Sequence, residues 1–122
     1  MTATFRYVNA KKDLTTPDAT DVYTCPAKTI AVIDSVIVSE DSGNADTITI
    51  TLIEKPDASG DYSSSAIFNL YKTKAISANG TAELLTHSGI YMTAQEKIVA
   101  EAATANRLHI ILSIREIFLG TN

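Results

Sequence analysis

Alternation of apolar and polar residues along the chain predicts β-strands. Residues 46–54 alternate strictly, with Ile48, Ile50 and Leu52 at one parity and threonines at the other. Residues 107–119 show the same two-residue period through their even positions. Because side chains alternate between the two faces of a strand, this pattern predicts half-buried strands in an antiparallel sheet. No long stretch of the chain shows the period of an amphipathic helix.

Turn residues divide the rest of the chain into further short strands. The pair Asn79-Gly80 is typical of a hairpin turn, because both residues tolerate positive φ. Short turns near 93–96 and 102–106 are the only helix candidates. The expected strands are residues 2–8, 20–24, 29–40, 46–54, 62–71, 73–77, 81–87, 89–92, 97–102 and 107–119. This spacing predicts an all-β fold, an antiparallel β-sandwich that is jelly-roll-like, with about 8–10 short strands.

The length of the chain favours a single domain. At 122 residues it has the common size of one domain, and an apolar content of 45% is enough for one core. We therefore expect residues 1–122 to form a single β-sandwich domain. Within it, we expect residues 1–20 to form an N-terminal strand or arm, followed by a polar connection around Pro17.

Two of the expected strands carry apolar residues on both faces. In strand 29–40 both parities are apolar, and they include Ile33 and Ile37. In strand 107–119, Ile111 opposes the even apolar positions, and the apolar phase changes near the end of the strand. Each sheet of a small sandwich has only one inner face, so the second apolar face is expected to meet a loop or another subunit. A β-bulge is an alternative cause of a phase change.

The charge balance excludes some classes of partner. The net charge is −4, and only three of the ten basic residues are arginines. This argues against a nucleic-acid partner, which requires a basic patch to neutralise phosphates, and against an electrostatic membrane anchor. No apolar run approaches the ~20 residues of a membrane-spanning helix, and the first residues lack a signal-peptide pattern. We expect no nucleic-acid or membrane partner, and synthesis in a reducing bacterial cytoplasm.

Side chains that carry chemistry are sparse. Asp41, Asn44 and Asp46 offer oxygen ligands, but their segment lacks a calcium-loop pattern, so we interpret it as a polar hairpin loop. His87 and His109 have no partner at metal-ligand spacing. There is no nucleophile elbow, P-loop or dinucleotide motif. The sequence therefore predicts no enzyme, no catalytic residues, no metal and no cofactor.

The single cysteine, Cys25, leaves two interpretations open. A free cysteine is commonly a small buried hydrophobic residue. An odd cysteine can also pair only with another chain, which makes an inter-subunit disulfide through Cys25 the alternative.

Five segments, taken in order, resemble a group of small structural proteins of tailed bacteriophages. Those proteins typically share a Val-Tyr-Thr-Cys-Pro-Ala strand end, an alternating Thr-Val strand, a Pro-Ala-Gly turn before Leu-Glu-Leu, and a closing Leu-Glu-Ile strand. The chain departs from them at Lys28, where they have glycine, at 77–80 and at 102–103. The matching segments are VYTCPAKTIAVIDSVIVS at 22–39, DTITITL at 46–52, AISANGTAELL at 75–85, KIVAEA at 97–102 and LHIILSIREI at 108–117.

The resemblance implies a virion-associated β-sandwich without enzymatic activity. The hypothesis that follows is a non-enzymatic structural component of a bacteriophage virion, located on the capsid, the neck or collar, or the tail, and stabilising it. Such a protein would bind other copies of itself and other virion proteins. From strand phase and position, the residues expected to contact partners are Phe5, Tyr7, Ile33, Ile37, His109, Ile111, Ile117, Phe118 and Leu119.

A second hypothesis places a receptor- or carbohydrate-binding module on the same fold. Sugar sites commonly use exposed aromatic rings, and the chain has five tyrosines and no tryptophan. The candidates for stacking on sugars are Tyr62, Tyr71 and Tyr91.

Overall fold

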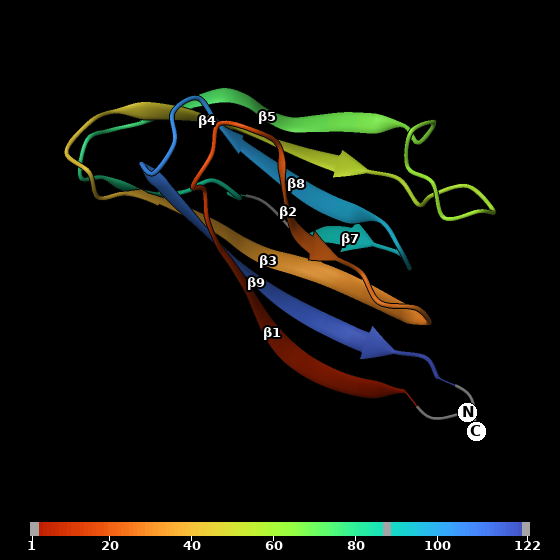
Figure 1. The fold of residues 1–122 in the computed structure, drawn as a ribbon. Coiled ribbons are helices and arrows are strands. Elements are labelled where there is room, and N and C mark those ends of the chain that lie inside the picture. The colour runs from red at the N-terminus through yellow and green to blue at the C-terminus, as the bar shows by residue number, and fades with distance from the viewer. Residues whose placement is uncertain (1–2, 87–88, 121–122) are drawn as a thin grey trace.

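In the part of the chain that the structure describes, nine β-strands form two antiparallel sheets that face each other (Figure 1). The computed structural model describes residues 3–86 and 89–120, and no helix occurs among them. Sheet A contains β1 (Thr4–Asp13), β9 (Leu108–Phe118) and β3 (Thr29–Glu40), with β6 (Thr81–Glu83) and β7 (Ile90–Met92) both paired to the far edge of β3. Sheet B contains, in order, β2 (Thr20–Thr24), β8 (Lys97–Ala102), β4 (Asp46–Ile53) and β5 (Ile67–Ile76).

The strand order is that of a jelly roll. If β6 and β7 are taken as one interrupted strand, each sheet has four positions, and most consecutive strands lie in opposite sheets. The last strand, β9, inserts between β1 and β3 in the middle of sheet A. The predicted antiparallel, jelly-roll-like β-sandwich is confirmed.

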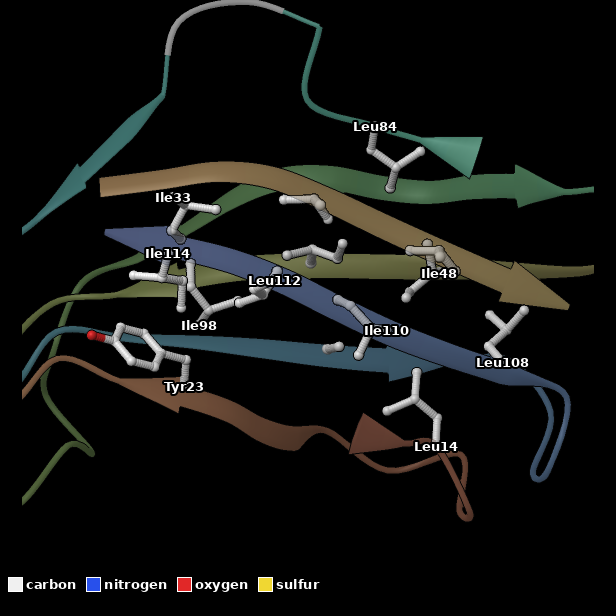
Figure 2. Close-up of a cluster of buried hydrophobic side chains, with 14 of the residues drawn as sticks. Leu14, Tyr23, Ile33, Ile48, Leu84, Ile98, Leu108, Ile110, Leu112 and Ile114 are labelled. Carbon is white, nitrogen blue, oxygen red and sulfur yellow. The ribbon is translucent and has the colours of Figure 1, made fainter. Parts of the chain in front are cut away.

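The core lies between the two sheets and is built almost entirely from aliphatic side chains (Figure 2). The even residues of β9 face inward from sheet A, as their alternation predicted. From sheet B, Ile48, Ile50 and Ile98 face them, and Leu14 and Leu84 close the ends of the cluster. Burial of this apolar surface is the main favourable contribution to folding.

A β-bulge explains part of the two-faced pattern of strand 29–40, because it brings residues of both parities to the inner face. The register between β3 and β9 shifts between Ile33 and Ser35, so that Asp34 is the additional residue. As a result both Ile33 and Val36 face the core, although their parities differ. The expectation that Ile33 contacts a partner is therefore wrong, because this side chain is fully buried in the monomer.

Strand β9 shows no phase change at its end. Alternation continues, and Glu116 takes the next inward position, where it is 2% exposed. Its carboxylate accepts hydrogen bonds from the Tyr23 hydroxyl at 2.5 Å and from Arg6 Nε at 2.5 Å. Burial raises the pKa of Tyr23, and the hydrogen bond to Glu116 adds to this effect. The apparent phase change in the sequence thus reflects a buried carboxylate at a core position.

The N-terminal segment is a strand of the sandwich rather than an arm. Strand β1 extends to Asp13, beyond the expected end at residue 8, and pairs with β9 at ten consecutive positions. Two expected strands, 62–71 and 73–77, are in fact one: β5 begins at Ile67 and contains an irregularity at Thr73, whose φ is 46°. Neither helix candidate forms a helix: 93–96 contains a turn, and in 102–106 Ala102 ends β8 while residues 103–106 form bends and turns.

Buried Glu40 holds two loops together at the end of β3. Its carboxylate accepts hydrogen bonds from the backbone N–H groups of Ser42, Gly43 and Asn79 and from the Ser42 hydroxyl. Burial by itself would raise the pKa of Glu40, but these hydrogen bonds outweigh it and lower the pKa to about 2. A turn is present at Asn79-Gly80, with Asn79 at a φ of 55°. It is not the expected hairpin turn, because it connects β5 of sheet B to β6 of sheet A and these strands do not pair.

Candidate subunit interface on the outer face of sheet A

The outward face of sheet A, here called the outer A face, collects most of the predicted contact residues. Paired residues of antiparallel strands lie on the same face, so the register fixes its membership. Six of the nine predicted contact residues lie on it: Phe5, Tyr7, Ile37, His109, Ile111 and Ile117.

One end of the outer A face is apolar and aromatic. Phe5 of β1, Ile117 of β9 and Ile30 of β3 are aligned across the sheet. In the next aligned row, Tyr7 of β1 and Tyr91 of β7 lie at the two ends. Phe5 is 68% exposed, Tyr7 85% and Tyr91 74%. Exposed apolar patches are typical of surfaces that contact a partner.

Between the two tyrosines lies a fixed ion pair. Arg115 Nε and Nη2 donate to the two carboxylate oxygens of Asp34 at 2.8 and 2.9 Å. Hydrogen bonding to Arg115 lowers the pKa of Asp34, and the same contact raises the pKa of Arg115. The bulge that places Asp34 in β3 therefore also provides the partner that orients Arg115. Tyr and Arg are the residue types most enriched at the energetic centres of protein interfaces.

The far end of the outer A face is charged. His109 lies in the last row, where Nδ1 contacts Asp13 and Nε2 lies 3.0 Å from Asp41. Hydrogen bonds to Asp13, and then to Asp41, raise the pKa of His109 and favour the charged imidazolium. The two carboxylates contact opposite nitrogens of the ring, so they do not converge on one ligand position. Asp41 of the polar loop is thus paired with His109, and Asp46 of the same loop accepts a hydrogen bond from the backbone N–H of Thr104.

Two other predicted contact residues lie at the end of the sandwich instead of on this face. Phe118 has the inward parity of β9, and because β9 ends there its ring is 43% exposed. It lines a hollow of about 230 Å³ with Thr4, Arg6, Pro26 and Thr29. Leu119 is half-buried, and its N–H donates to the carbonyl oxygen of Lys28 at 2.7 Å. Strand phase alone predicted that both residues face outward, but neither of them extends the outer A face.

Cys25 lies in the core, which confirms the interpretation as a buried hydrophobic residue and contradicts the alternative of an inter-subunit disulfide. The residue is 1% exposed, and its thiol donates weakly to the carbonyl oxygen of Thr29 at 3.4 Å. Burial, with the nearby charge of Glu116, raises the pKa of Cys25 to about 11. A buried, protonated thiol cannot meet a second chain unless the sandwich opens.

We expect Cys25 of the folded protein to resist alkylation. Since the thiolate is the reactive form, labelling by iodoacetamide at pH 8 should be at least about 100-fold slower in buffer than in 6 M urea. Mass spectrometry of samples taken over time measures both rates. Labelling at similar rates in the two solutions would contradict the buried position of the sulfur.

The three tyrosines proposed for sugar binding have different environments. The Tyr62 hydroxyl donates to the carbonyl oxygen of Gln95, and Lys97 Nζ lies 4.2 Å from the ring centre. Tyr71 packs against the core, and its hydroxyl donates to the carbonyl oxygen of Leu84. Only Tyr91 of the three belongs to the outer A face. His87 lies outside the described residues.

Residues 3–86 and 89–120 contain no group of three or more His, Cys, Asp or Glu side chains arranged to hold a metal ion. In the same part of the chain, no helix is long and apolar enough to cross a membrane.

The outer A face contains residues that sequence reasoning missed: Arg115, Asp34, Lys11 and Glu83. If the first strand had been predicted to continue to Asp13, Lys11 would have been placed on the outer A face.

Comparison with known proteins shows the fold. No protein-family model and no curated protein sequence matches the chain. Among solved structures, a protein of the T13 viral particle of infectious bursal disease virus matches with a TM-score of 0.59, at 7% identity, over 93% of this chain. A protein of the Gx strain of that virus matches with a TM-score of 0.54, at 7% identity, over 97% of this chain.

The chain spans about a third of the length of these two viral proteins, 31% and 33%. A protein of the capsid of Helicobacter pylori bacteriophage KHP30 aligns over 95% of this chain and 89% of its own length, at 12% identity and a TM-score of 0.49. At such low identity, the likeness to the infectious bursal disease virus proteins defines the fold alone.

Proposed function

We propose that this chain is a non-enzymatic structural component of a bacteriophage virion. It is made in the host cytoplasm and assembles as a homo-oligomer on the capsid, the neck or collar, or the tail, where it binds other virion proteins and stabilises the particle. The observation that carries the proposal is the outer A face, on which Phe5, Tyr7 and Tyr91 are largely exposed on a rigid sheet. A protein that acts by packing against copies and neighbours requires such a surface.

Two further observations support this role. The fold of this chain is similar to that of a protein of the T13 viral particle of infectious bursal disease virus and to that of a protein of the Gx strain of this virus. In addition, β1 is a long sheet edge without a bulge, whereas β2 and β5 contain register shifts and β6 and β7 have three residues each. Short or irregular edge strands discourage strand addition, so β1 is the edge most open to a partner strand.

The test is mass spectrometry of purified particles of the phage or prophage that encodes the chain. We expect its peptides in particles that have passed a density gradient and a high-salt wash, in a constant ratio to the major capsid protein. Recovery only from the soluble fraction of infected cells would overturn the proposal. Light scattering of the purified protein measures self-assembly independently.

A carbohydrate-binding module is the second candidate, and Tyr7 and Tyr91 favour it. They lie on the same face of sheet A, three strand spacings or about 14 Å apart, with the Arg115–Asp34 pair between them. Two rings at this separation can stack on a linear glycan while the ion pair meets its hydroxyl groups. A glycan array in which wild-type protein binds, and the Tyr7→Ser, Tyr91→Ser variant does not, would support this candidate over the first.

A further inference from the structure

Two aligned rows of the outer A face have complementary ends. In the first row, the register aligns Tyr7 of β1, Arg115 of β9, Val32 of β3 and Tyr91 of β7. In the second row it aligns Lys11, Ile111, Ile37 and Glu83, the last of these on β6. Each row therefore begins on β1 and ends on the opposite edge of the sheet. The first row has a tyrosine at both ends, and the second has a cation at one end and an anion at the other.

This pattern makes the face complementary to itself under one symmetry operation. A two-fold axis parallel to the strands, passing between β9 and β3, places each row on the same row of a second copy in reversed order. Lys11 then lies opposite Glu83 of the partner subunit, and Tyr7 lies opposite Tyr91 of the partner subunit. At the centre, Ile111 meets Ile37 of the partner subunit, and the apolar row brings Ile117 to Ile30 of the partner subunit.

The other two-fold arrangement of the same face lacks this match. An axis perpendicular to the strands reverses the order of rows, so that Lys11 lies opposite Tyr7 of the partner subunit. Phe5 then lies opposite Asp13 of the partner subunit, and no pair of opposite charges is formed between Lys11 and Glu83. Since charge complementarity fixes orientation at interfaces, the first arrangement is favoured.

We propose that the outer A faces of two copies of this chain pack against each other around a two-fold axis parallel to the strands. The proposal rests on the proposed function, because it specifies the contact by which the virion component binds itself. Four strands at about 4.8 Å spacing and nine residues along β9 give roughly 500 Å² per copy. The total of about 1,000 Å² is at the lower limit for a specific interface, so the isolated dimer should be of moderate affinity.

An alternative arrangement pairs β1 of one copy with the β6/β7 edge of the next copy. It would also bring Lys11 towards Glu83, but it adds copies head to tail in an open series. Strands β6 and β7 offer only three residues each to such a pairing. That arrangement would also leave the half-buried isoleucines of the face, Ile37, Ile111 and Ile117, uncovered. The face-to-face contact covers them, and it closes at two copies.

Sedimentation equilibrium of the full chain and two charge-reversal variants tests this arrangement. The wild type should reach twice the 13.1 kDa of one chain. Lys11→Glu and Glu83→Lys should each raise the dimer Kd by about tenfold or more, because each change puts like charges together at two symmetric positions. An equimolar mixture of the two variants should return to within about threefold of the wild-type Kd, since a heterodimer contains only Glu–Lys pairs.

Further variants separate binding from folding. Ile111→Asp should raise the Kd by at least about 100-fold, because it places a carboxylate at the apolar centre. Should that variant unfold by circular dichroism, Tyr7→Ser with Tyr91→Ser probes the same contact at residues that are almost fully exposed. Phe68→Ser, at an exposed aromatic residue on sheet B, is the matched control and should leave the Kd unchanged.

Three results would overturn the two-fold packing. The first is a mixture of the two variants whose dimer Kd is no lower than that of either variant alone. The others are masses that grow beyond two copies through head-to-tail addition, and a wild-type protein that stays monomeric. In each case the particle mass spectrometry decides separately whether the chain is a virion component. A protein that is present in particles but monomeric in solution would retain the proposed function and lose this contact.

Discussion

Replacement of Leu112 by alanine is expected to lower the free energy of unfolding by about 3 kcal/mol. The Leu112 side chain is fully buried between the sheets (Figure 2). Its truncation removes apolar contacts and leaves a cavity that the two rigid sheets cannot close. Urea unfolding followed by circular dichroism measures the change.

The adjacent residue provides the matched control for this prediction. Ile111→Ala removes a similar side chain from the half-exposed outer A face, so the unfolding free energy of the monomer should fall by less than about 1 kcal/mol. Both proteins should be measured at a concentration at which the chain is monomeric. Equal losses for the two variants would contradict the orientation of β9.

Removal of the Glu116 carboxylate is expected to cost about 3 kcal/mol of unfolding free energy, because it leaves a buried hydroxyl without an acceptor and removes a partly exposed ion pair. In Glu116→Ala the Tyr23 hydroxyl loses its acceptor inside the sandwich, and Arg6 loses its ion pair. The two partners should contribute unequally. Tyr23→Phe leaves a buried carboxylate with one hydrogen bond fewer and should cost about 1–3 kcal/mol, whereas Arg6, whose side chain is 62% exposed, should cost less than about 1 kcal/mol on replacement by alanine.

A double-mutant cycle checks the origin of the Glu116 effect. If the Tyr23–Glu116 hydrogen bond carries the loss, the combined Tyr23→Phe, Glu116→Ala variant should be less destabilised than the sum of the single variants. Additive losses would assign the effect to packing at the end of β9 and not to the hydrogen bond.

Alternation along the sequence predicted the fold because one face of each strand must be buried. This argument located the core of β4 and β9 and the sandwich itself. It failed at two local features, a bulge and a buried carboxylate. The bulge at Asp34 moved Ile33 into the core, and Glu116 occupied a core position that the sequence marked as polar.

The candidate interface was predicted in part. The alternation of apolar residues placed Ile37, Ile111 and Ile117 on an outward face. Within a single strand, an apolar residue at a position that faces away from the core can be recognised from the sequence. Alternation does not identify the neighbours of these residues on the adjacent strands. Lys11 and Glu83 lie far apart in the sequence, and only the strand order brings them into one row. Strand order depends on long-range pairing, which a local pattern does not encode.

The central position of β9 in sheet A has a consequence for the time course of folding. β9 is synthesised after β1 and β3, yet in sheet A these two strands pair with β9 and not with each other. Sheet A cannot form on the ribosome until residues 108–118 have emerged, and pairing between such distant segments makes folding slow. The outer A face therefore exists only on chains that include β9, and a fragment that stops before Leu108 cannot present this face to a partner.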